Sequence, residues 1–148
     1  MIVAMPAKDI ISKLAVQFPG SLEEAGSDSV RVKADALLAV MDYLKNTAGL
    51  DFDYFSFVTA VDFYQYFEVV YHLTSLKNNH SLFIKTRVYD RANPTVPSVT
   101  RLWQGADFQE REVYDLMGIK FAGHPNMKRI VLWEGFPGYP LRKDWNTR

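Results

Sequence analysis

The densest group of chemically capable side chains lies in residues 110–130, EREVYDLMGIKFAGHPNMKRI. It holds three carboxylates, Glu110, Glu112 and Asp115, together with one histidine, His124. Carboxylates can act as general acid and base, or can join histidine in binding a metal ion. The stretch could therefore be an active site, a metal site or a rigid structural device, and the spacing of its residues helps to decide between these.

The carboxylates do not have the spacing that acid–base catalysis needs. Such catalysis requires two carboxyl groups that face one cavity and have separated pKa values. Residues 106–118, ADFQEREVYDLMG, place their apolar side chains on one face of an amphipathic helix. On that helix Glu110 and Glu112 point to different sides, so we do not expect them to form a catalytic pair.

Each charge of this helix also has a structural role available. Asp107, followed three residues later by Glu110, matches a capping box that would begin the helix. Arg111 and Asp115 are four residues apart, which is the spacing of an ion pair along a helix. Gly118 can adopt the left-handed conformation that ends a helix. These features favour a structural role for the stretch.

Other kinds of chemical site lack their required patterns. His72, His80 and His124 are scattered, and none has a second metal-ligand residue at helical spacing on a predicted helix. No glycine-rich loop follows a strand and opens a helix, as phosphate binding requires, and no serine lies in a GxSxG turn. We therefore expect no metal, phosphate or nucleophile site in this chain.

The composition is that of one ordinary folded domain: 148 residues, 48% hydrophobic and 23% charged. Seventeen basic residues balance seventeen acidic ones, so no net charge attracts nucleic acid or an anionic membrane. Because the chain has no cysteine, it offers no thiolate for zinc or an iron–sulfur cluster. Neither a secretory signal pattern nor an apolar run of ~18 residues is present, and we expect a cytosolic protein that is soluble by itself.

The elements that precede the charged stretch combine helices with strands. Residues 6–18 have helical spacing, and residues 21–25 and 29–33 have an extended pattern. Asp35 can then cap a helix that ends at Gly49. Three segments rich in β-branched and aromatic residues follow and predict an antiparallel meander: 54–61, 66–75 and 80–90. Because the side chains of 66–75 alternate between two faces, one face of the meander should be largely wet or covered by another element.

The remaining elements are shorter. Residues 91–98, RANPTVPS, predict a loop because their two prolines disfavour helix and ladder pairing. Residues 99–105 predict a short helix that ends at Gly105, and two brief strands are expected at 119–121 and 129–133. The sequence thus predicts an α+β domain.

The tail WEGFPGYPLRKDW, residues 133–145, should be extended and lie on the surface, because its prolines and glycines exclude a helix. Leaving the side chains of Phe136, Tyr139, Leu141 and Trp145 in water is costly, whereas aromatic and arginine side chains anchor protein interfaces. We expect the tail to dock onto a partner.

Residues 98–145 resemble the signature region of the thirty-kilodalton subunit family of respiratory complex I, which in bacteria is the C subunit of NADH-quinone oxidoreductase. The family pattern of Glu-Arg-Glu, two residues, Asp, two residues and Gly falls on residues 110–118, and it continues through Phe121, His124-Pro125, Arg129-Ile130, Gly138, Pro140 and residues 141–144. The sequence TAVD at 59–62 is also similar to the family, whereas Tyr139 stands where a histidine is frequent.

The resemblance implies one two-layer α+β domain over residues 1–148, with a core in 1–90, signature helix and strands in 98–130 and a docking tail in 133–148. It implies a scaffold subunit in the peripheral arm of a proton-translocating NADH:quinone oxidoreductase, with no catalytic centre or cofactor of its own. FMN, iron–sulfur clusters and quinone would be held by other subunits. The implied partners in complex I are the forty-nine-kilodalton or D-type subunit and the twenty-kilodalton or B-type subunit. The complex would place the chain on the cytoplasmic side of the cell membrane, with membrane association only through the complex.

The family's motif also implies the residues that brace the domain and dock it. Glu110, Arg111, Glu112, Asp115 and Arg129 would form a partly buried ionic and capping network between the helix and the tail. Arg142, Lys143 and Asp144 would pair across the interface. The full set of structural and docking residues is Glu110, Arg111, Glu112, Asp115, Gly118, His124, Pro125, Arg129, Phe136, Tyr139, Arg142, Lys143, Asp144 and Trp145.

Two other functions stay open from the sequence. Membrane-bound hydrogenases and ferredoxin-linked quinone reductases have an equivalent subunit with the same motif. The second alternative is an independent hydrolase that would use Glu112, Asp115 and His124.

Overall fold

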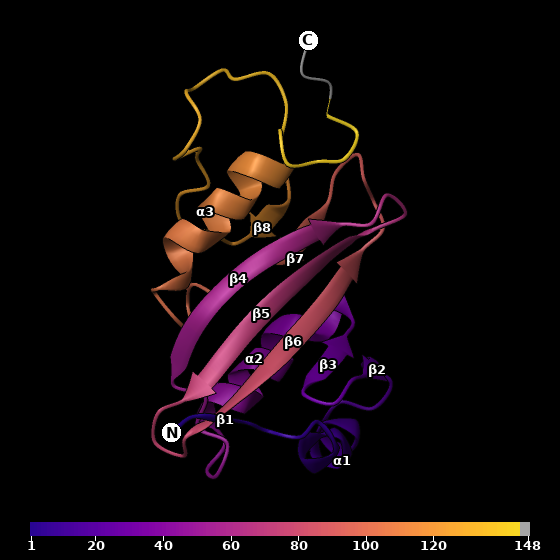
Figure 1. Cartoon of the computed structure of the whole chain (residues 1–148), viewed down its shortest axis with the longest axis vertical. Helices are drawn as coiled ribbons and strands as arrows, with labels where there is room; N and C mark the ends of the chain where they lie inside the picture. The colour runs from indigo at the N-terminus through magenta and orange to yellow at the C-terminus, as the bar shows by residue number, and fades with distance from the viewer. Residues whose placement is uncertain (146–148) are drawn as a thin grey trace.

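The computed structural model describes residues 1–145. Strands and helices alternate at first, then three long strands follow one another, and a helix between two short strands comes last (Figure 1). The elements in chain order are β1 (Val3–Ala4), α1 (Lys8–Gln17), β2 (Leu22–Ala25), β3 (Ser29–Val32), the 3-10 helix η1 (Ala34–Ala36), α2 (Leu37–Asn46), β4 (Tyr54–Asp62), β5 (Phe67–Ser75), β6 (His80–Val88), β7 (Thr95–Pro97), α3 (Ala106–Met117) and β8 (Lys120–Ala122). The predicted α+β class is confirmed.

A mixed sheet organises the domain. Its path runs β2-β3-β6-β5-β4, and β1 pairs with β6 off this path. The strands β4, β5 and β6 form the predicted antiparallel meander, whereas β3 joins β6 in parallel. The strand β4 is therefore an edge of the sheet. The helix α2 crosses behind the central strands, so the domain has one layer of sheet and one layer of helices (Figure 1).

The core lies between the sheet and the first two helices. Alternate residues of β5, namely Phe67, Val69, Tyr71 and Leu73, are fully buried on the helix side. The helix α1 contributes Ile10 and Leu14, and α2 contributes Leu37, Val40, Met41 and Leu44. The alternation expected for residues 66–75 is thus present, because one face of β5 packs against helices.

The opposite face of the meander is covered by its own side chains. His72 of β5 stacks on Phe57 of β4, with ring centroids 5.3 Å apart, and lies 4.6 Å from the ring of Phe83 of β6. Burial under these rings lowers the pKa of His72. Nearer the other end of the strands Arg87 pairs with Glu68 at 3.2 Å.

Three expectations for local structure are wrong. Residues 95–97 lie in the predicted loop but form β7, which pairs in parallel with β8. The strand has only three residues and ends at Pro97, so it needs few ladder hydrogen bonds and tolerates the proline. Residues 99–105 form turns in which Leu102 and Trp103 both donate to the carbonyl of Val99. Residues 129–133 form no strand, because their backbone N–H groups bond to a side chain of α3.

The predicted caps also differ from the structure. Asp35 lies within η1, and no side chain caps η1 or α2. The helix α3 begins after Gly105, so Asp107 lies in its first turn and the capping box does not form. Gly118 does end α3 in the left-handed conformation, with φ at 76°, as predicted.

The helix α3 lies beside β4, with β7 and β8 behind it, and the remaining chain arches over its C-terminal end (Figure 1). Within residues 1–145 no helix has the length and apolar character to cross a membrane.

Truncating side chains on the two faces of β5 should lower the free energy of unfolding by different amounts. Leu73→Ala removes a fully buried side chain, so we expect the free energy of unfolding to fall by about 2–5 kcal/mol through lost burial and an added cavity. Val70→Ala in the same strand removes a partly exposed side chain and should cost less. Chemical denaturation measures both, and equal losses would contradict this assignment of the core face.

Candidate partner-docking site

The carboxylate of Asp115 joins α3 to the segment that follows β8. Its Oδ2 atom accepts hydrogen bonds from three successive backbone N–H groups, those of Ile130, Val131 and Leu132, at 3.0, 2.6 and 2.9 Å. The side chain is fully buried. Successive N–H groups that converge in this way form an anion-binding concavity, which here is filled by the protein's own carboxylate. The interaction turns the chain back across the end of α3.

Arg129 connects this concavity to the tail. Its Nε lies 3.5 Å from Asp115 Oδ1, and its Nη2 donates to the carbonyl of Gly138 at 2.7 Å. The guanidinium also lies over the rings of Tyr139 and Phe136, at 4.9 and 5.7 Å from their centroids. One arginine therefore holds a buried carboxylate, a backbone carbonyl and two aromatic rings of the tail.

Glu110 fastens the other end of α3 to the loop after β7. Its carboxylate accepts a hydrogen bond from the Ser98 hydroxyl at 2.6 Å and one from the Val99 N–H at 2.9 Å. The side chain is fully buried, and this burial raises the pKa of Glu110 despite the two hydrogen bonds that lower it. The expected capping role is replaced by this contact across 11 or 12 residues of chain.

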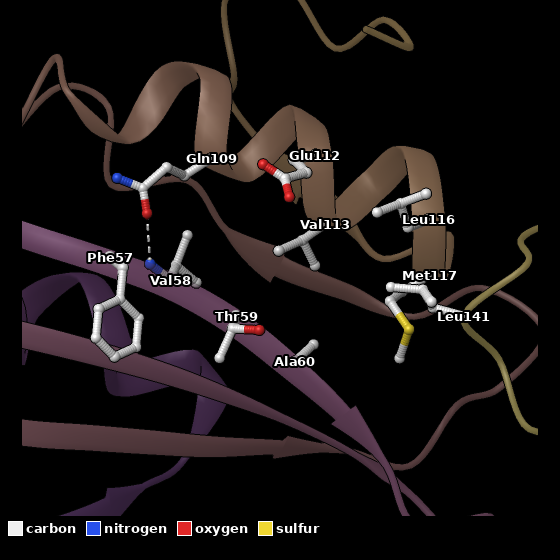
Figure 2. A pocket seen from close by; sticks show the side chains of 10 residues that line it. All are labelled: Phe57, Val58, Thr59, Ala60, Gln109, Glu112, Val113, Leu116, Met117 and Leu141. Atoms are coloured by element: carbon white, nitrogen blue, oxygen red, sulfur yellow. Dashed lines mark hydrogen bonds between the residues drawn. The ribbon is translucent and has the colours of Figure 1, made fainter. Parts of the chain in front are cut away.

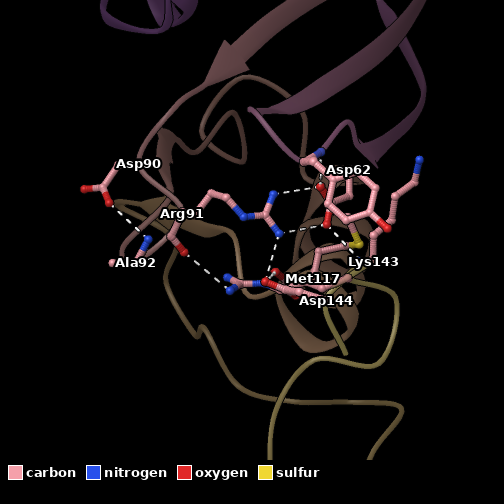
Figure 3. A network of polar contacts seen from close by, with 9 residues as sticks. Asp62, Asp90, Arg91, Ala92, Met117, Lys143 and Asp144 are labelled. Carbon is pink, nitrogen blue, oxygen red and sulfur yellow. Dashed lines mark hydrogen bonds and ion pairs between the residues drawn. The ribbon is translucent and has the colours of Figure 1, made fainter. Parts of the chain in front are cut away.

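A second anchor holds the tail to the end of β4. Asp62 forms a two-bond pair with Arg91, at 2.7 and 3.0 Å, and accepts the backbone N–H of Lys143 at 2.9 Å (Figure 3). Arg91 also donates to Asp144 at 3.1 Å. The guanidinium of Arg91 holds the pKa of the Asp62 carboxyl well below its usual range. Residues that are far apart in sequence thus meet at one buried carboxylate.

The turn at Gly118 brings the helix end against the tail. Arg142 Nε donates to the carbonyl of Met117 at 2.6 Å, and the N–H of Leu141 donates to the carbonyl of Leu116 at 3.0 Å. A Cβ at Gly118 would lie 2.6 Å from Arg142 and 2.7 Å from Tyr139. Glycine is therefore required both by the positive φ and by the close packing of the tail.

The tail exposes a large apolar surface although it is held in place. Phe136 contacts Trp133 and Trp145, with ring centroids 5.4 and 5.7 Å apart. Within the tail Trp133 is 64% exposed and Leu141 59%, and Val131, two residues before the tail, is 58% exposed. A fixed aromatic and aliphatic surface of this kind is typical of a protein interface.

The other predicted site residues have separate contacts. Arg111 donates to the carbonyl of Lys128 at 3.0 Å and does not form the predicted ion pair, because Asp115 is turned toward Arg129. Glu112 is exposed, and Pro125 is exposed in the loop that follows β8. His124 accepts the Asn126 N–H at Nδ1 and has Nε2 at 2.9 Å from Asp107 Oδ1.

The predicted ionic and capping network forms only in part: Arg129 pairs with Asp115 and bonds to the tail, whereas the capping box and the pair of Arg111 with Asp115 do not form. Glu110 and Asp115 are buried at separate places, each bonded mainly to backbone or hydroxyl donors, and Glu112 joins neither. Of the tail residues Arg142, Lys143 and Asp144, all are engaged within the chain through the contacts above. Pairing of these three with a partner protein stays a prediction.

Reasoning from the sequence missed Asp62, Arg91, Ser98 and Gln109 as members of the site. Asp62 ends the TAVD motif, which was the one available signal for it. Ser98 bonds to Glu110 across 12 residues, and Gln109 of α3 accepts the N–H of Val58 in β4 across 51 residues at 2.9 Å. No local spacing indicates such contacts.

The arrangement does not assemble the hydrolase considered above. Asp115 is enclosed by three backbone donors, and both ring nitrogens of His124 lie against protein atoms. Within the described residues no cluster of three histidine, aspartate or glutamate side chains could hold a metal ion. What this geometry can do is hold a helix, a loop and an aromatic tail in one fixed surface.

Comparison with solved structures agrees with this architecture. A chain in the structure of a membrane-bound sulfane sulfur reductase, described as an archaeal respiratory membrane complex, superposes with a TM-score of 0.79. The match covers 95% of this chain and 86% of that one at 25% identity. The fold is that of a subunit of respiratory membrane complexes.

Sequence comparisons identify the family. The model of the respiratory-chain NADH dehydrogenase 30 kDa subunit matches residues 30–148. The C subunit of NADH-quinone oxidoreductase from Moorella thermoacetica is 43% identical over 144 residues, which cover 95% of each chain. The C 2 subunit of the same enzyme from Rhizobium meliloti is 41% identical over 88% of this chain and 75% of its own length. The chain belongs to this thirty-kilodalton subunit family of the respiratory-chain NADH dehydrogenase.

Removing the carboxylate of Asp115 tests the anchor between α3 and the following segment. We expect Asp115→Ala to lower the free energy of unfolding by roughly 3–5 kcal/mol, because three N–H groups and Arg129 lose their buried acceptor. Urea denaturation measures the change. Asp35→Ala, at an exposed position without a capping bond, is the control and should stay within about 0.5 kcal/mol of the wild type. A similar small loss for Asp115→Ala would refute the anchoring role.

The second anchor should make stability depend on pH. Because the pKa of Asp62 is lower in the folded than in the unfolded chain, its contribution is present above the unfolded value of about 3.9 and is lost as the pH falls below it. We expect Asp62→Asn to reduce the acid-induced loss of stability, and to cost about 1.5–3 kcal/mol at neutral pH. Urea unfolding across a pH series measures both. Arg91→Met removes the same pair and should likewise make the free energy of unfolding depend less on pH. If the acid-induced loss of stability is unchanged in both variants, the pair of Asp62 and Arg91 does not cause it.

Proposed function

We propose that this chain is a non-catalytic scaffold subunit of the peripheral arm of a proton-translocating NADH:quinone oxidoreductase. The observation that supports the proposal is the aromatic tail, which is held against α3 with exposed apolar side chains, on a fold shared with a chain of a respiratory membrane complex. Relatives at about 40% identity are named as C subunits of NADH-quinone oxidoreductase, which supports membership of that enzyme complex.

In this proposal the buried carboxylates brace the domain rather than react. Glu110, Asp115 and Asp62 each hold together segments that are distant in sequence. The chain would support electron transfer from NADH to quinone by positioning the subunits that hold FMN and iron–sulfur clusters, while holding none itself. The absence of cysteine is consistent with that division of roles.

The proposed neighbours are the D-type and B-type subunits of the complex, on the cytoplasmic side of the cell membrane. The exposed side chains of Trp133, Val131 and Leu141 supply the apolar anchor area that such a contact needs. Contact with the membrane would occur only through the complex. The identities to subunits of NADH-quinone oxidoreductase, higher than to the sulfane sulfur reductase chain, favour this parent complex over a hydrogenase or ferredoxin-linked relative.

Assembly of the complex provides the test. We expect Trp133→Ala to fold normally, because this side chain is 64% exposed, but to bind the complex depleted of this subunit about 30-fold more weakly through loss of an interface anchor. Quantitative co-purification with the D-type and B-type subunits measures binding, and thermal denaturation checks the fold.

Val16→Ser provides a matched control, because Val16 is 81% exposed on α1, away from the tail. This control should assemble like the wild type. A wild-type chain that never joins these subunits would overturn the proposed function, and a Trp133→Ala chain that assembles normally would remove the tail from the docking surface.

A further inference from the structure

Arginine side chains and aromatic rings alternate between the sheet and the tail. The guanidinium of Arg91 lies over the ring of Phe67, 4.6 Å from its centroid, and that of Arg142 lies over the same ring at 5.1 Å. Arg142 also lies over the ring of Tyr139 at 5.0 Å. Through Arg129 the contacts continue to the outer rings of the tail. This arginine–aromatic series consists of Arg91, Phe67, Arg142, Tyr139, Arg129, Phe136 and Trp145.

The two ends of the series have different surroundings. Phe67 is the first residue of β5 and is fully buried, so its ring lies out of reach of any partner protein. At the other end Phe136 contacts Trp133, which is 64% exposed. Direct side-chain contacts therefore connect the interior of the sheet to the exposed aromatic surface of the tail.

Arg142 joins the two halves of the series. Within residues 1–145 it is the one arginine that lies over a ring of the sheet and over a ring of the tail. Its Nε and Nη1 donate to the carbonyls of Met117 and Arg91, at 2.6 and 3.4 Å. No carboxylate of these residues lies at ion-pair distance from it, whereas Arg91 and Arg129 are both paired with carboxylates. These contacts use the planar shape and the several donors of a guanidinium.

The helix end beside Arg142 is held to the sheet. Gln109 of α3 accepts the Val58 N–H of β4 at 2.9 Å, and Leu141 of the tail lies at the C-terminal end of the same helix (Figure 2). Gly118 leaves little space there, since a Cβ atom at this glycine would lie 2.6 Å from Arg142 Nη2. Arg142 thus lies against a fixed base, and the shape of its side chain sets the position of the tail.

We propose that Arg142 is a positioning residue for partner binding. Through its contacts with Phe67 and Tyr139 it fixes the rings of the tail in the arrangement that a neighbouring subunit recognises. The inference rests on the proposed function, since it needs a partner that binds the tail. In this role Arg142 acts inside the chain, whereas pairing across the interface would use its charge on the partner. The buried ring of Phe67 contributes to binding by the same route.

Replacing Arg142 by lysine separates the shape of the side chain from its charge. Lysine keeps the charge but lacks the planar guanidinium. We expect Arg142→Lys to bind the complex depleted of this subunit about 10-fold more weakly, because its contacts with Phe67 and Tyr139 are weakened. Quantitative co-purification with the D-type and B-type subunits measures binding. Binding like that of the wild type would overturn the positioning role.

The ring of Phe67 provides the sharper test, because a partner cannot touch it. We expect Phe67→Leu, which keeps an apolar side chain but removes the ring, to weaken binding about 10-fold. Phe52→Leu is the matched control, because Phe52 is equally buried but lies outside the series, 4.8 Å from the ring of His80. This control should bind nearly like the wild type. Equal losses of binding in the two variants would attribute the effect to general destabilisation and overturn the proposal.

Hydrogen exchange reports the position of the tail in the free chain. The N–H of Leu141 donates to the carbonyl of Leu116 at 3.0 Å, so its exchange rate measures local opening of the tail from α3. We expect Arg142→Lys and Phe67→Leu each to raise this rate about 10-fold. Phe52→Leu should leave the rate unchanged, because it destabilises the chain equally with the tail closed or open.

The outcomes distinguish this inference from the proposed function. A wild-type chain that joins the complex, together with unchanged binding and unchanged Leu141 exchange in Arg142→Lys, would overturn the positioning role and leave the scaffold function standing. Failure of the wild-type chain to join the complex would overturn both. If Phe67→Leu does not fold, the binding and the Leu141 exchange rate of Arg142→Lys still decide.

Discussion

The hydrogen bonds from three successive backbone N–H groups to the buried carboxylate of Asp115 determine the shape of the C-terminal half of this domain. A buried carboxylate without partners would be strongly unfavourable, so the chain after β8 must return to α3. That return places Arg129 over the tail rings and sets the path of the segment that follows. The exposed position of Trp133 is therefore a consequence of an electrostatic requirement at the buried end of a helix.

Two further buried carboxylates also need hydrogen-bond donors, and each holds a distant segment of the chain in place. Glu110 draws the loop after β7 to the start of α3, and Asp62 draws the tail to the end of β4. The sheet supplies the rigid body to which all three segments are attached. A surface composed of a helix, a loop and a tail without regular structure thereby becomes rigid, which lowers the entropy cost of binding a partner.

The sequence predicted the helices and strands more accurately than the contacts of the docking site. Periodicity located α1, α2, α3 and the meander, because each has a strong pattern of alternating or helical burial. The strand expected at 129–133 failed because its residues pattern like a strand while their N–H groups serve Asp115. The capping role of Glu110 and the pairing of Arg111 with Asp115 failed because contacts distant in sequence replaced the local ones. Spacing rules describe neighbours along the chain, and this site consists of contacts between segments that are far apart.

The bond between Asp62 and the Lys143 backbone spans 81 residues, which has a consequence for biosynthesis. During translation the meander leaves the ribosome first and can fold before residue 143 has been added. The tail closes only onto a finished sheet, so its aromatic surface takes its final form last. A chain whose sheet has misfolded would lack the closing contact at Asp62, and its tail would not reach the arrangement described above.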